Sequence, residues 1–597
     1  MTTGLLGCGI PDSTDVRVAG PPRAGTSLSG AADQLGTQDP PARTETLDPA
    51  TFVMNYLSAA AGETDGAYGR VHEFLPKDTR TLLPPKGASE VTLTVVRVEE
   101  TDFDLAPAGS VTRVTVPYEV VGVLQSDGTI GPPPATPSGQ YTFEVGRAQP
   151  DARGKVEPGL WLHNPPRELM LSTKALAKHY VPYAVYFWSS DNSHLVPDLR
   201  HLPRKVPRER HATEIAGWLN DGPSEWLRSV ARSLPDGIRV TGNVAETDAG
   251  RLEVNLSLPN AGADEEAELD RLVTQLAWSM PDDQNLIDVK VGNESRRSFD
   301  AVSEREIMPL YDVSERNQRF VVYDGQVRAV ASGVSDPPPF PPPLTVDTNQ
   351  NVLSAGIVSS GDTVAAGLVV SAGDRQALAA GIGSGSVAVK RLGGRSYGAM
   401  GRPVWLKVPY AKQRMTGLVV ADGKLFRFDV EAGMVEVRIP NVSGPLASVG
   451  AALDGRRIAV VAGGRVYVAA VNTDGAGLTA GEARPVPVPL TAPTAVDWFD
   501  ETSLAVAGTG RGGRPMIYQV TVDGGADFDL HTPDAPVTQL ATYPNNPVVG
   551  KSSTWLMYEA AGSVWANRFN SYEQVTAQQV VGAEAGQNGP RAPFFLY

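Results

Sequence analysis

The sequence predicts a multidomain protein in which two small α+β domains precede an all-β propeller of about six blades. Three observations support this fold class. The length of 597 residues corresponds to three or four domains at about 150 residues each. The 61 glycines and 49 prolines exceed the ~12% share of an average protein, which favours many turns and short strands. Apolar residues follow a helical spacing only up to about residue 300, and after residue 318 they alternate with polar ones as in strands.

Charge, hydropathy and cysteine content exclude several classes of protein. The net charge of −15 argues against nucleic acid as the main partner, because phosphate binding requires a basic surface. No run approaches 18 uninterrupted apolar residues, so we expect no membrane-spanning helix. A single cysteine excludes an intramolecular disulfide and every metal site that needs several cysteines.

Cys8 is the candidate lipid-attachment residue. It follows Leu5-Leu6-Gly7, and the stretch after it, up to residue 47, is rich in Pro, Gly, Ser, Thr and Asp. Such a stretch buries too little apolar surface to fold, so residues 1–47 are expected to form the attachment site and a disordered tether. The sequence before the thiol resembles a bacterial lipobox, in which diacylglycerol is joined to the cysteine sulfur. Two or three acyl chains would hold the folded domains at a membrane durably.

The segment before Cys8 departs from the lipobox pattern in one respect. Residues 1–7 supply neither a positively charged start nor the apolar stretch of about 7–15 residues that a signal peptide needs. Either the natural start lies upstream, or the likeness is coincidental and Cys8 is a free cysteine near a polar terminus. We favour lipid attachment, because the sole cysteine stands directly before a tether.

The first folded domain is expected over residues 48–180. Asp48 and Pro49 suit the N-cap and first turn of a helix, whose apolar face is formed by Phe52, Val53, Tyr56 and Leu57. Alternating patterns predict strands over residues 91–98, 111–118, 141–145 and 160–162. A helix followed by a meander indicates a sheet with one face covered by helix.

A second α+β unit, similar to a GerMN domain as argued below, is expected over residues 181–300. Strand patterns cover residues 183–188, 195–203, 238–244, 252–258 and 287–291. Helical spacing covers residues 215–219, 226–234 and 269–276, with Asp221-Gly222-Pro223 separating the first two. Residues 301–317 are expected to be a linker.

A repeated pattern predicts the propeller over residues 318–597. Similar segments of small, alternating residues followed by a polar turn begin at Ser354, Ser448, Thr494 and Thr538. The interval is about 45 residues, which is typical of a propeller blade. The first interval is twice as long, so a degenerate copy is expected near residue 401. The hairpin over residues 320–330 is expected to join strands from the C-terminal segment and close the ring, since an open blade would leave unpaired edge groups.

The search for chemistry predicts no catalytic, cofactor or metal site. Gly508–Gly513 fits GxGxxG, but a strand pattern follows where a dinucleotide site needs a helix. The acidic run 264–270 is better explained as the start of a helix. Trp218, Trp226 and Trp278 lie on apolar helix faces and are expected in the core rather than on a sugar platform. The sequence has seven histidines, and none stand at i, i+3 or i+4 spacing to one another: His72, His163, His179, His194, His201, His211 and His531. His194 and His201 flank a strand and could meet in space, but we expect surface or interdomain packing for them.

The central channel of a propeller is a common place for an active site. The residues expected there are small and uncharged: Ser354, Ala355, Gly356, Ser448, Val449, Gly450 and Ala451. Asp497 is the only carboxylate in the aligned copies outside turn positions. One carboxylate cannot hold a hard cation that takes six to eight oxygen ligands, so a catalytic propeller is disfavoured.

The order of the domains and five segments of the second domain carry a resemblance to a known family. The segments are Tyr186-Phe187, Leu195–Arg200, Leu219–Leu227, Gly250–Ser257 and Gln275–Ser279. The chain resembles the actinobacterial LpqB lipoproteins, which combine a lipobox cysteine, an α+β domain, a GerMN (sporulation and germination type) domain and a C-terminal propeller.

The resemblance implies a non-enzymatic accessory protein at the extracytoplasmic face of the cell membrane. Its implied partner is the extracytoplasmic domain of an MtrB-like sensor histidine kinase, in a two-component system that governs cell-wall metabolism and division. Two alternatives remain open: a module that binds cell-wall glycan, and a hydrolase with its site at the channel mouth. Saturable retention on purified cell wall would indicate glycan binding. Loss of turnover in Asp497→Ala would indicate a hydrolase.

Overall fold

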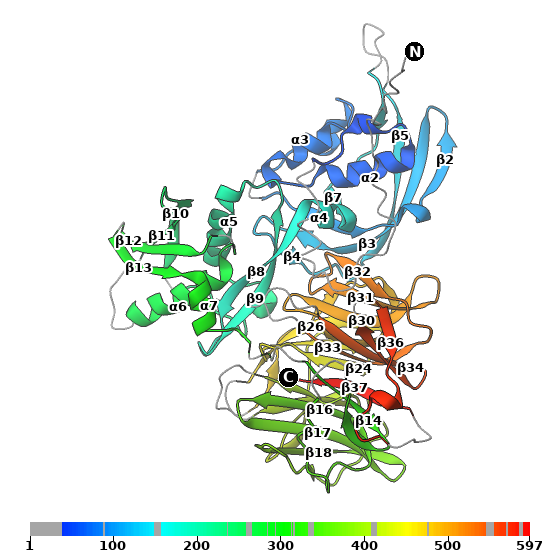
Figure 1. Ribbon diagram of the computed structural model, residues 1–597. Helices are drawn as coiled ribbons and strands as arrows, with labels where there is room; N and C mark the ends of the chain where they lie inside the picture. The colour runs from blue at the N-terminus through cyan, green and yellow to red at the C-terminus, as the bar shows by residue number, and fades with distance from the viewer. Residues whose placement is uncertain are drawn as a thin grey trace, which may run out of the picture.

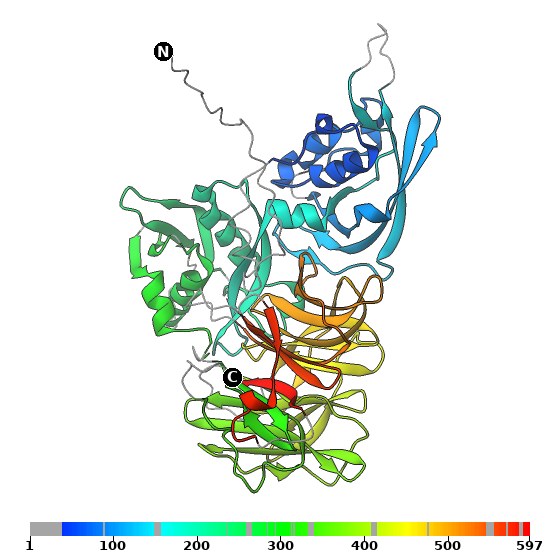
Figure 2. The same cartoon turned by 45° about the vertical axis from the view of Figure 1, so that its right-hand side comes forward.

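The structure is a computed structural model (Figures 1 and 2). It describes residues 39–87, 90–148, 157–235, 237–257, 265–282, 284–292, 294–311, 313, 317–331, 339–407, 415–473, 477–544, 554–568, 571–583 and 589–597. Cys8 and residues 9–38 of the predicted tether lie outside the described residues. The last part of that tether, residues 39–47, packs on the first domain instead, where Arg43 donates to the Pro158 and Leu160 carbonyls.

The first domain is a curved sheet with helices on one face. As predicted, the Asp48 side chain caps the first helix, by accepting from the Thr51 backbone N–H at 2.8 Å. The sheet order is β6-β5-β3-β1-β7, with β2 and β4 paired to β3. The elements are α2 (Pro49–Ala59), α3 (Ala67–His72), β1 (Leu93–Arg97), β2 (Asp104–Ala108), β3 (Val111–Leu124), β4 (Ile130–Gly131), β5 (Ser138–Arg147), β6 (Leu160–Leu162), β7 (Leu169–Ser172) and α4 (Thr173–His179).

The second domain consists of a long two-stranded ribbon and a four-stranded sheet covered by helices. The ribbon, β8 with β9, lies where the two α+β domains and the propeller meet (Figure 1). The sheet order is β10-β11-β12-β13. The elements are β8 (Tyr180–Trp188), β9 (Leu195–Pro203), α5 (Arg208–Asp221), β10 (Arg239–Glu246), β11 (Leu252–Ser257), α6 (Glu265–Ser279), β12 (Leu286–Val291), β13 (Glu294–Asp300) and α7 (Ala301–Ile307).

Two expectations for the second domain were wrong. Residues 226–234 form only a 3₁₀ turn at Glu225–Leu227 instead of a helix. The apolar side chains of Trp226 and Leu227 pack on the core of the second domain, which explains the apolar spacing without a helix. Trp226 also contacts the apolar core of the propeller. Residues 301–307, expected as linker, form α7, which packs on α6.

The remaining strands form a propeller, as the repeat predicted. The innermost strands β16, β20, β24, β29, β33 and β37 contact one another in that cyclic order. The described strands form six blades: β16 (Val352–Ser360), β17 (Thr363–Ala372), β18 (Arg375–Ser384) and β19 (Lys390–Arg391); β20 (Val404–Leu406), β21 (Thr416–Ala421), β22 (Lys424–Asp429) and β23 (Gly433–Val437); β24 (Leu446–Ala451), β25 (Arg457–Ala462), β26 (Arg465–Asn472), β27 (Thr479–Ala480) and β28 (Arg484–Val486); β29 (Leu490–Trp498), β30 (Ser503–Gly510), β31 (Pro515–Thr521) and β32 (Asp527–His531); β33 (Val537–Tyr543), β34 (Trp555–Ala560), β35 (Ser563–Arg568) and β36 (Ser571–Gln574); and β37 (Arg591–Leu596), β14 (Gln318–Tyr323) and β15 (Gln326–Ala329).

The ring closes as the sequence predicted. The hairpin β14–β15 pairs with the C-terminal strand β37, so the last blade combines both ends of the propeller sequence. In Figure 1 the red C-terminal strand lies beside the green strands β14 and β16. The degenerate repeat expected near residue 401 is the blade that begins with β20.

The small residues of the inner strands have a packing explanation. A Cβ on Gly356 would clash with the carbonyl oxygen of Pro403 in the next blade, and a Cβ on Gly450 would lie 2.9 Å from Asp497 Oδ1. The Trp405 indole N–H donates to the Gly356 carbonyl at 2.9 Å. The strands therefore approach one another closely around the axis, which only residues with little or no side chain allow.

Candidate functional site at the propeller axis and the domain junction

Asp497, the sole axial carboxylate that the sequence singled out, lies at one end of the propeller axis. The cavity beside it has a volume of about 20 Å³, which is room for about one water molecule. Arg402, Trp405 and Tyr597 also line this cavity. The axis is therefore filled by the protein's own side chains at this end.

The oxygens of Asp497 are engaged by groups from three blades. Oδ2 accepts from Arg402 Nη2 at 2.7 Å and from the Thr542 backbone N–H at 3.1 Å, and Oδ1 accepts from the Trp498 backbone N–H at 3.1 Å. The two charged side chains are only 4% and 8% exposed. Burial raises the pKa of Asp497, and the Arg402 charge offsets part of that rise. This arrangement is a buried ion pair that holds blades together.

The chemistry of the axis follows from these contacts. A carboxylate whose oxygens already accept three hydrogen bonds has little capacity left to bind a cation or to accept a proton from a substrate. Among the residues that the structure describes, no group of three or more His, Cys, Asp or Glu side chains is placed to hold a metal ion. The small inner-strand residues Ser354 and Ser448 bond instead to neighbouring strands, through Gln539 and the Val496 N–H.

The densest polar cluster lies where the three domains meet, around Arg200 of β9. The Arg200 side chain is fully buried and donates from Nη2 to Asp198 Oδ2 and to the Gly222 carbonyl, both at 2.8 Å. Its Nη1 lies 3.1 Å from Asp127 Oδ2, in the β3–β4 turn of the first domain. Asp198 accepts two further hydrogen bonds from Ser224. One guanidinium thus joins the first and second domains.

His201, the next residue of β9, joins the second domain to the propeller. His201 Nε2 lies 2.6 Å from Asp523 Oδ2, and both side chains are buried. Burial alone would raise the pKa of Asp523, but His201 and Arg484 lower it below its usual value. Arg484, on the outer strand of its blade, also donates to the Ile130 carbonyl of the first domain at 2.5 Å.

The first domain contacts the propeller directly as well. The Arg97 side chain, 3% exposed, pairs with Glu119 of its own domain at 2.8 Å and with Asp527 of the propeller at 3.1 Å. It also donates to the carbonyl oxygens of Pro487 and Gly524. These contacts, with those of Arg200 and His201, form what we call the junction cluster. Because Arg97, Arg200 and His201 each pair with a carboxylate of another domain, the cluster fixes the three domains relative to one another.

A separate contact fixes the linker side of the second domain to the propeller. Glu501, in the β29–β30 turn, accepts from Tyr186 Oη at 2.7 Å and from Tyr311 Oη at 3.5 Å. Nearby, Arg457 pairs with Asp454 at 2.6 Å with both side chains buried. Burial raises the pKa of Glu501 to about 7.

The Glu501 contact predicts that stability depends on pH. The pKa of Glu501 is about 7 in the folded protein, against a reference value of 4.5. The folded protein therefore binds this proton more tightly than the unfolded chain does. The stabilising effect is complete below about pH 4.5 and is lost as the pH rises to 7. We expect a loss of about 2 kcal/mol over this range, less than the full shift implies because Glu501 as a whole residue is only half-buried. Thermal or urea unfolding from pH 4.5 to 8 measures it, and Glu501→Gln should remove this part of the pH dependence.

The structure places the other residues singled out from the sequence as follows. His194 and His201 do not meet: His194 Nδ1 lies 2.6 Å from Ser193 Oγ at one end of β9, and His201 contacts the propeller at the other. Trp218 and Trp278 are 5% exposed and therefore buried, as expected, and Trp226 is partly buried. The acidic run opens α6, which begins at Glu265. Gly508–Gly513 forms the β30–β31 hairpin turn.

Sequence reasoning missed the junction cluster. A signal was present, because Asp198, Arg200 and His201 interrupt an otherwise apolar strand, and buried charges require partners. The partners lie in other domains, so the sequence alone did not identify them. In the described part of the chain, no helix has both the length and the apolar character needed to cross a membrane.

Comparisons with known proteins agree with this architecture. A family model described as "Sporulation and spore germination" matches residues 184–291, and one described as "Lipoprotein LpqB beta-propeller domain" matches residues 330–573. "Lipoprotein LpqB" of Streptomyces coelicolor is 26% identical over 605 aligned residues, which cover 90% of this chain and 88% of that protein.

Other relatives match over shorter lengths. The chain spans less than half of "Lipoprotein LpqB" of Cutibacterium acnes: the match is 27% identical over 279 residues and covers 46% of this chain and 42% of the relative. Among solved structures, TolB from Acinetobacter baumannii matches with a TM-score of 0.32 and 12% identity, covering 50% of this chain and 70% of that one.

Proposed function

The chain belongs to the LpqB lipoprotein family, and from that premise we propose that it is a lipid-anchored, extracytoplasmic accessory protein. In this proposal it binds the extracytoplasmic domain of an MtrB-like sensor histidine kinase and thereby modulates a two-component system for cell-wall metabolism and division. Binding, rather than catalysis, is its proposed activity.

The observation that carries the proposal is the filled end of the propeller axis. Asp497 there is committed to an ion pair with Arg402, and the adjoining space is about 20 Å³. A site of this size admits no substrate, since ligand pockets measure about 300–1,000 Å³. The rigid junction cluster adds support, because a fixed arrangement of domains offers a large preformed surface to a protein partner at little entropic cost.

The anchor is tested by Cys8→Ser. We expect the wild-type protein to sediment with membranes and the variant to move almost entirely to the soluble fraction, because it lacks the sulfur that carries the acyl chains. Ser13→Ala, a nearby substitution that keeps the thiol, serves as the control. Unchanged partitioning of Cys8→Ser would defeat the proposed lipid anchor. The measurement is the distribution of the protein between ultracentrifuged fractions of cells that produce it from its natural start.

The partner is tested by crosslinking in living cells from photoreactive residues on all three domains. Crosslinks to the sensor kinase support the proposal. Saturable retention on purified cell wall without such crosslinks would favour glycan binding instead. Metal-dependent turnover that is abolished by Asp497→Asn, combined with Arg402→Met to keep the propeller folded, would favour a hydrolase.

A further inference from the structure

The second domain has a hollow that neither the junction cluster nor the propeller uses. Its volume is about 500 Å³, and Trp188, Val273, Phe299 and Met308 contribute its apolar lining. These residues come from β8, α6 and β13 and from the residue after α7. The hollow lies within the size range of ligand sites, far above the space at the propeller axis.

Exposed apolar side chains lie on α7 and beside it, and one of them, Met308, also lines the hollow. Ile307 is 72% exposed, Val302 43%, Leu286 39% and Met308 38%. Leu286 adjoins α7, since it pairs with Asp300, the N-cap residue of that helix. Single exposed apolar residues are ordinary, but a group beside a hollow marks an interaction site. We call the hollow, with Met308 and the adjoining Ile307, the α7 groove.

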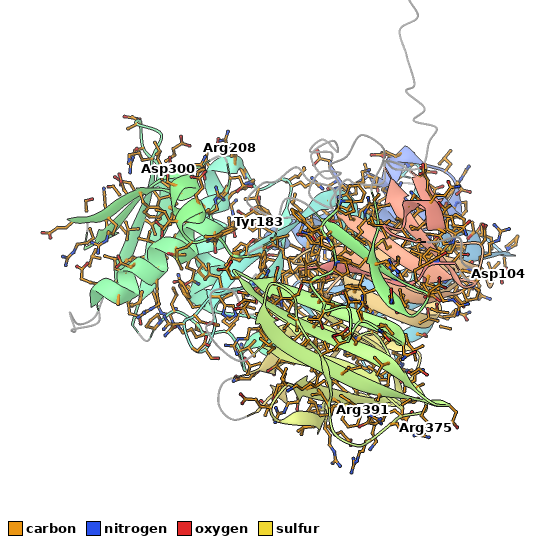
Figure 3. All side chains as sticks on the ribbon, turned by 60° about the horizontal axis from the view of Figure 1, so that its bottom comes forward. Asp104, Tyr183, Arg208, Asp300, Arg375 and Arg391 are labelled. Atoms are coloured by element: carbon orange, nitrogen blue, oxygen red, sulfur yellow. The ribbon has the colours of Figure 1, made fainter. Side chains whose placement is uncertain are left out.

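Among the residues that the structure describes, those that line the hollow all come from residues 188–308, outside the first domain and the propeller. In Figures 1 and 2, α6 and the four-stranded sheet lie on the flank of the second domain that is turned away from the first domain. In Figure 3, Asp300, at the start of α7, lies far from the propeller residues Arg375 and Arg391. The inner side of α7 explains why it folds: Ala301 is buried, and Glu304 accepts from Thr274 of α6 at 3.0 Å. That packing leaves its outer apolar residues without a role in the fold.

The charges around the groove indicate the chemistry of its partner. The charged residues that line the hollow itself balance, with Asp270 and Glu304 against Arg271 and Arg297. The elements that carry them, α6, β13 and α7, are net negative, with eight carboxylates and four arginines in their sequences. Three of these arginines are already paired: Arg271 with Glu268 at 2.5 Å, Arg297 with Asp270 at 3.2 Å, and Arg305 with Asp282 at 2.6 Å. Asp270 is 69% and Asp282 92% exposed. The surface around the groove is therefore negative, which attracts a basic partner and disfavours an anionic lipid surface.

We propose that the α7 groove docks a basic amphipathic segment of the protein partner. Apolar side chains of that segment enter the hollow beside Phe299 and Met308, and its Lys or Arg side chains meet the carboxylates of the rim. Such a mode combines apolar anchors with electrostatic complementarity, which sets the rate and specificity of association. The inference rests on the proposed function and adds to it the docking surface and the chemistry of the docking segment.

The test compares two matched substitutions in the full chain. Ile307→Lys removes an apolar side chain at the groove and adds a charge of the partner's sign. Val346→Lys makes the same change at an equally exposed position of the propeller, where the side chain is 78% exposed. Affinity for the purified extracytoplasmic domain of the sensor kinase is measured at low and high salt. We expect Ile307→Lys to weaken binding at least about tenfold, Val346→Lys to leave it unchanged, and salt to weaken wild-type binding.

The outcomes separate this inference from the function on which it rests. Equal affinity of Ile307→Lys and wild type for the kinase domain overturns the groove and leaves the proposed function standing. Absence of wild-type binding overturns the proposed function, and the inference with it. A change of oligomeric state on Ile307→Lys, seen by light scattering, would mean that a second copy occupies the groove and would overturn the inference. The inference would also be overturned if Ile307→Lys changed the binding of the protein to anionic vesicles and not its binding to the kinase domain.

Discussion

Arg200→Ala is expected to lower the free energy of unfolding by about 3–5 kcal/mol, because it leaves a buried charge without its partner. The Arg200 side chain is 0% exposed and its partner Asp198 is 2% exposed. Without the guanidinium, Asp198 would keep only the two hydrogen bonds from Ser224. The Gly222 carbonyl would also lose its donor. Chemical unfolding monitored by tryptophan fluorescence, together with limited proteolysis at the domain boundary, measures the effect.

Arg113→Ala provides the matched control for Arg200→Ala. Arg113 is also a strand arginine paired with a carboxylate, Glu144 at 3.3 Å, but its side chain is 56% exposed. An exposed pair of this kind contributes about 0–1 kcal/mol. If Arg200→Ala costs no more than Arg113→Ala, and the junction is no more open to protease, the domains are not fixed through this cluster.

A fixed junction has a consequence for signalling. Arg97, Arg200 and His201 join the three domains pairwise, so a partner docked on the second domain also sets the position of the propeller. Binding then costs little loss of interdomain freedom, which favours affinity. If the protein binds a partner as proposed, loosening the junction by Arg200→Ala should weaken that binding even though the Arg200 side chain is buried.

The sequence predicted the propeller well because blade geometry repeats locally. Each blade needs small residues on its inner strand and a turn after it, and this requirement returns about every 45 residues whatever the partners are. The same reasoning located the worn copy that became β20 and the hairpin β14–β15 that closes the ring with β37. The edge strands of a blade need pairing partners, and the hairpin β14–β15 belongs to no complete repeat, so the C-terminal strand was the remaining partner for it.

The sequence failed where long-range contacts override local pattern. Residues 226–234 have helical spacing, but Trp226 and Leu227 face packing partners on two sides, so a 3₁₀ turn satisfies them better than a helix. Residues 301–317 lie between two recognisable patterns and are expected to be a linker, but residues 301–307 form α7 because they pack on α6. The partners of His201 and Arg200 lie in other domains, and no spacing within β9 identifies them.

The ion pair at the propeller axis gives the second large effect: Asp497→Ala is expected to cost about 3–5 kcal/mol of stability. The substitution leaves Arg402, 8% exposed, without a counter-charge and the Thr542 backbone N–H without its acceptor. Because Asp497 lies between three blades, we also expect the propeller to lose cooperativity, seen as a broadened thermal transition. Differential scanning calorimetry measures both.

One double variant separates the effect of the charges from the effect of the shape of the axial pair. Arg402→Met combined with Asp497→Asn removes both charges and keeps the acceptor for Thr542, so it should recover most of the stability lost in Asp497→Ala, since a paired buried charge adds little beyond its apolar replacement. A role in chemistry would give a different result. If Asp497 acted on a substrate, the double variant would be stable and yet inactive, whereas a binding module should retain its affinity for the kinase domain. Stability restored together with partner binding therefore assigns the axial carboxylate to architecture, and stability restored without function would assign it to a site.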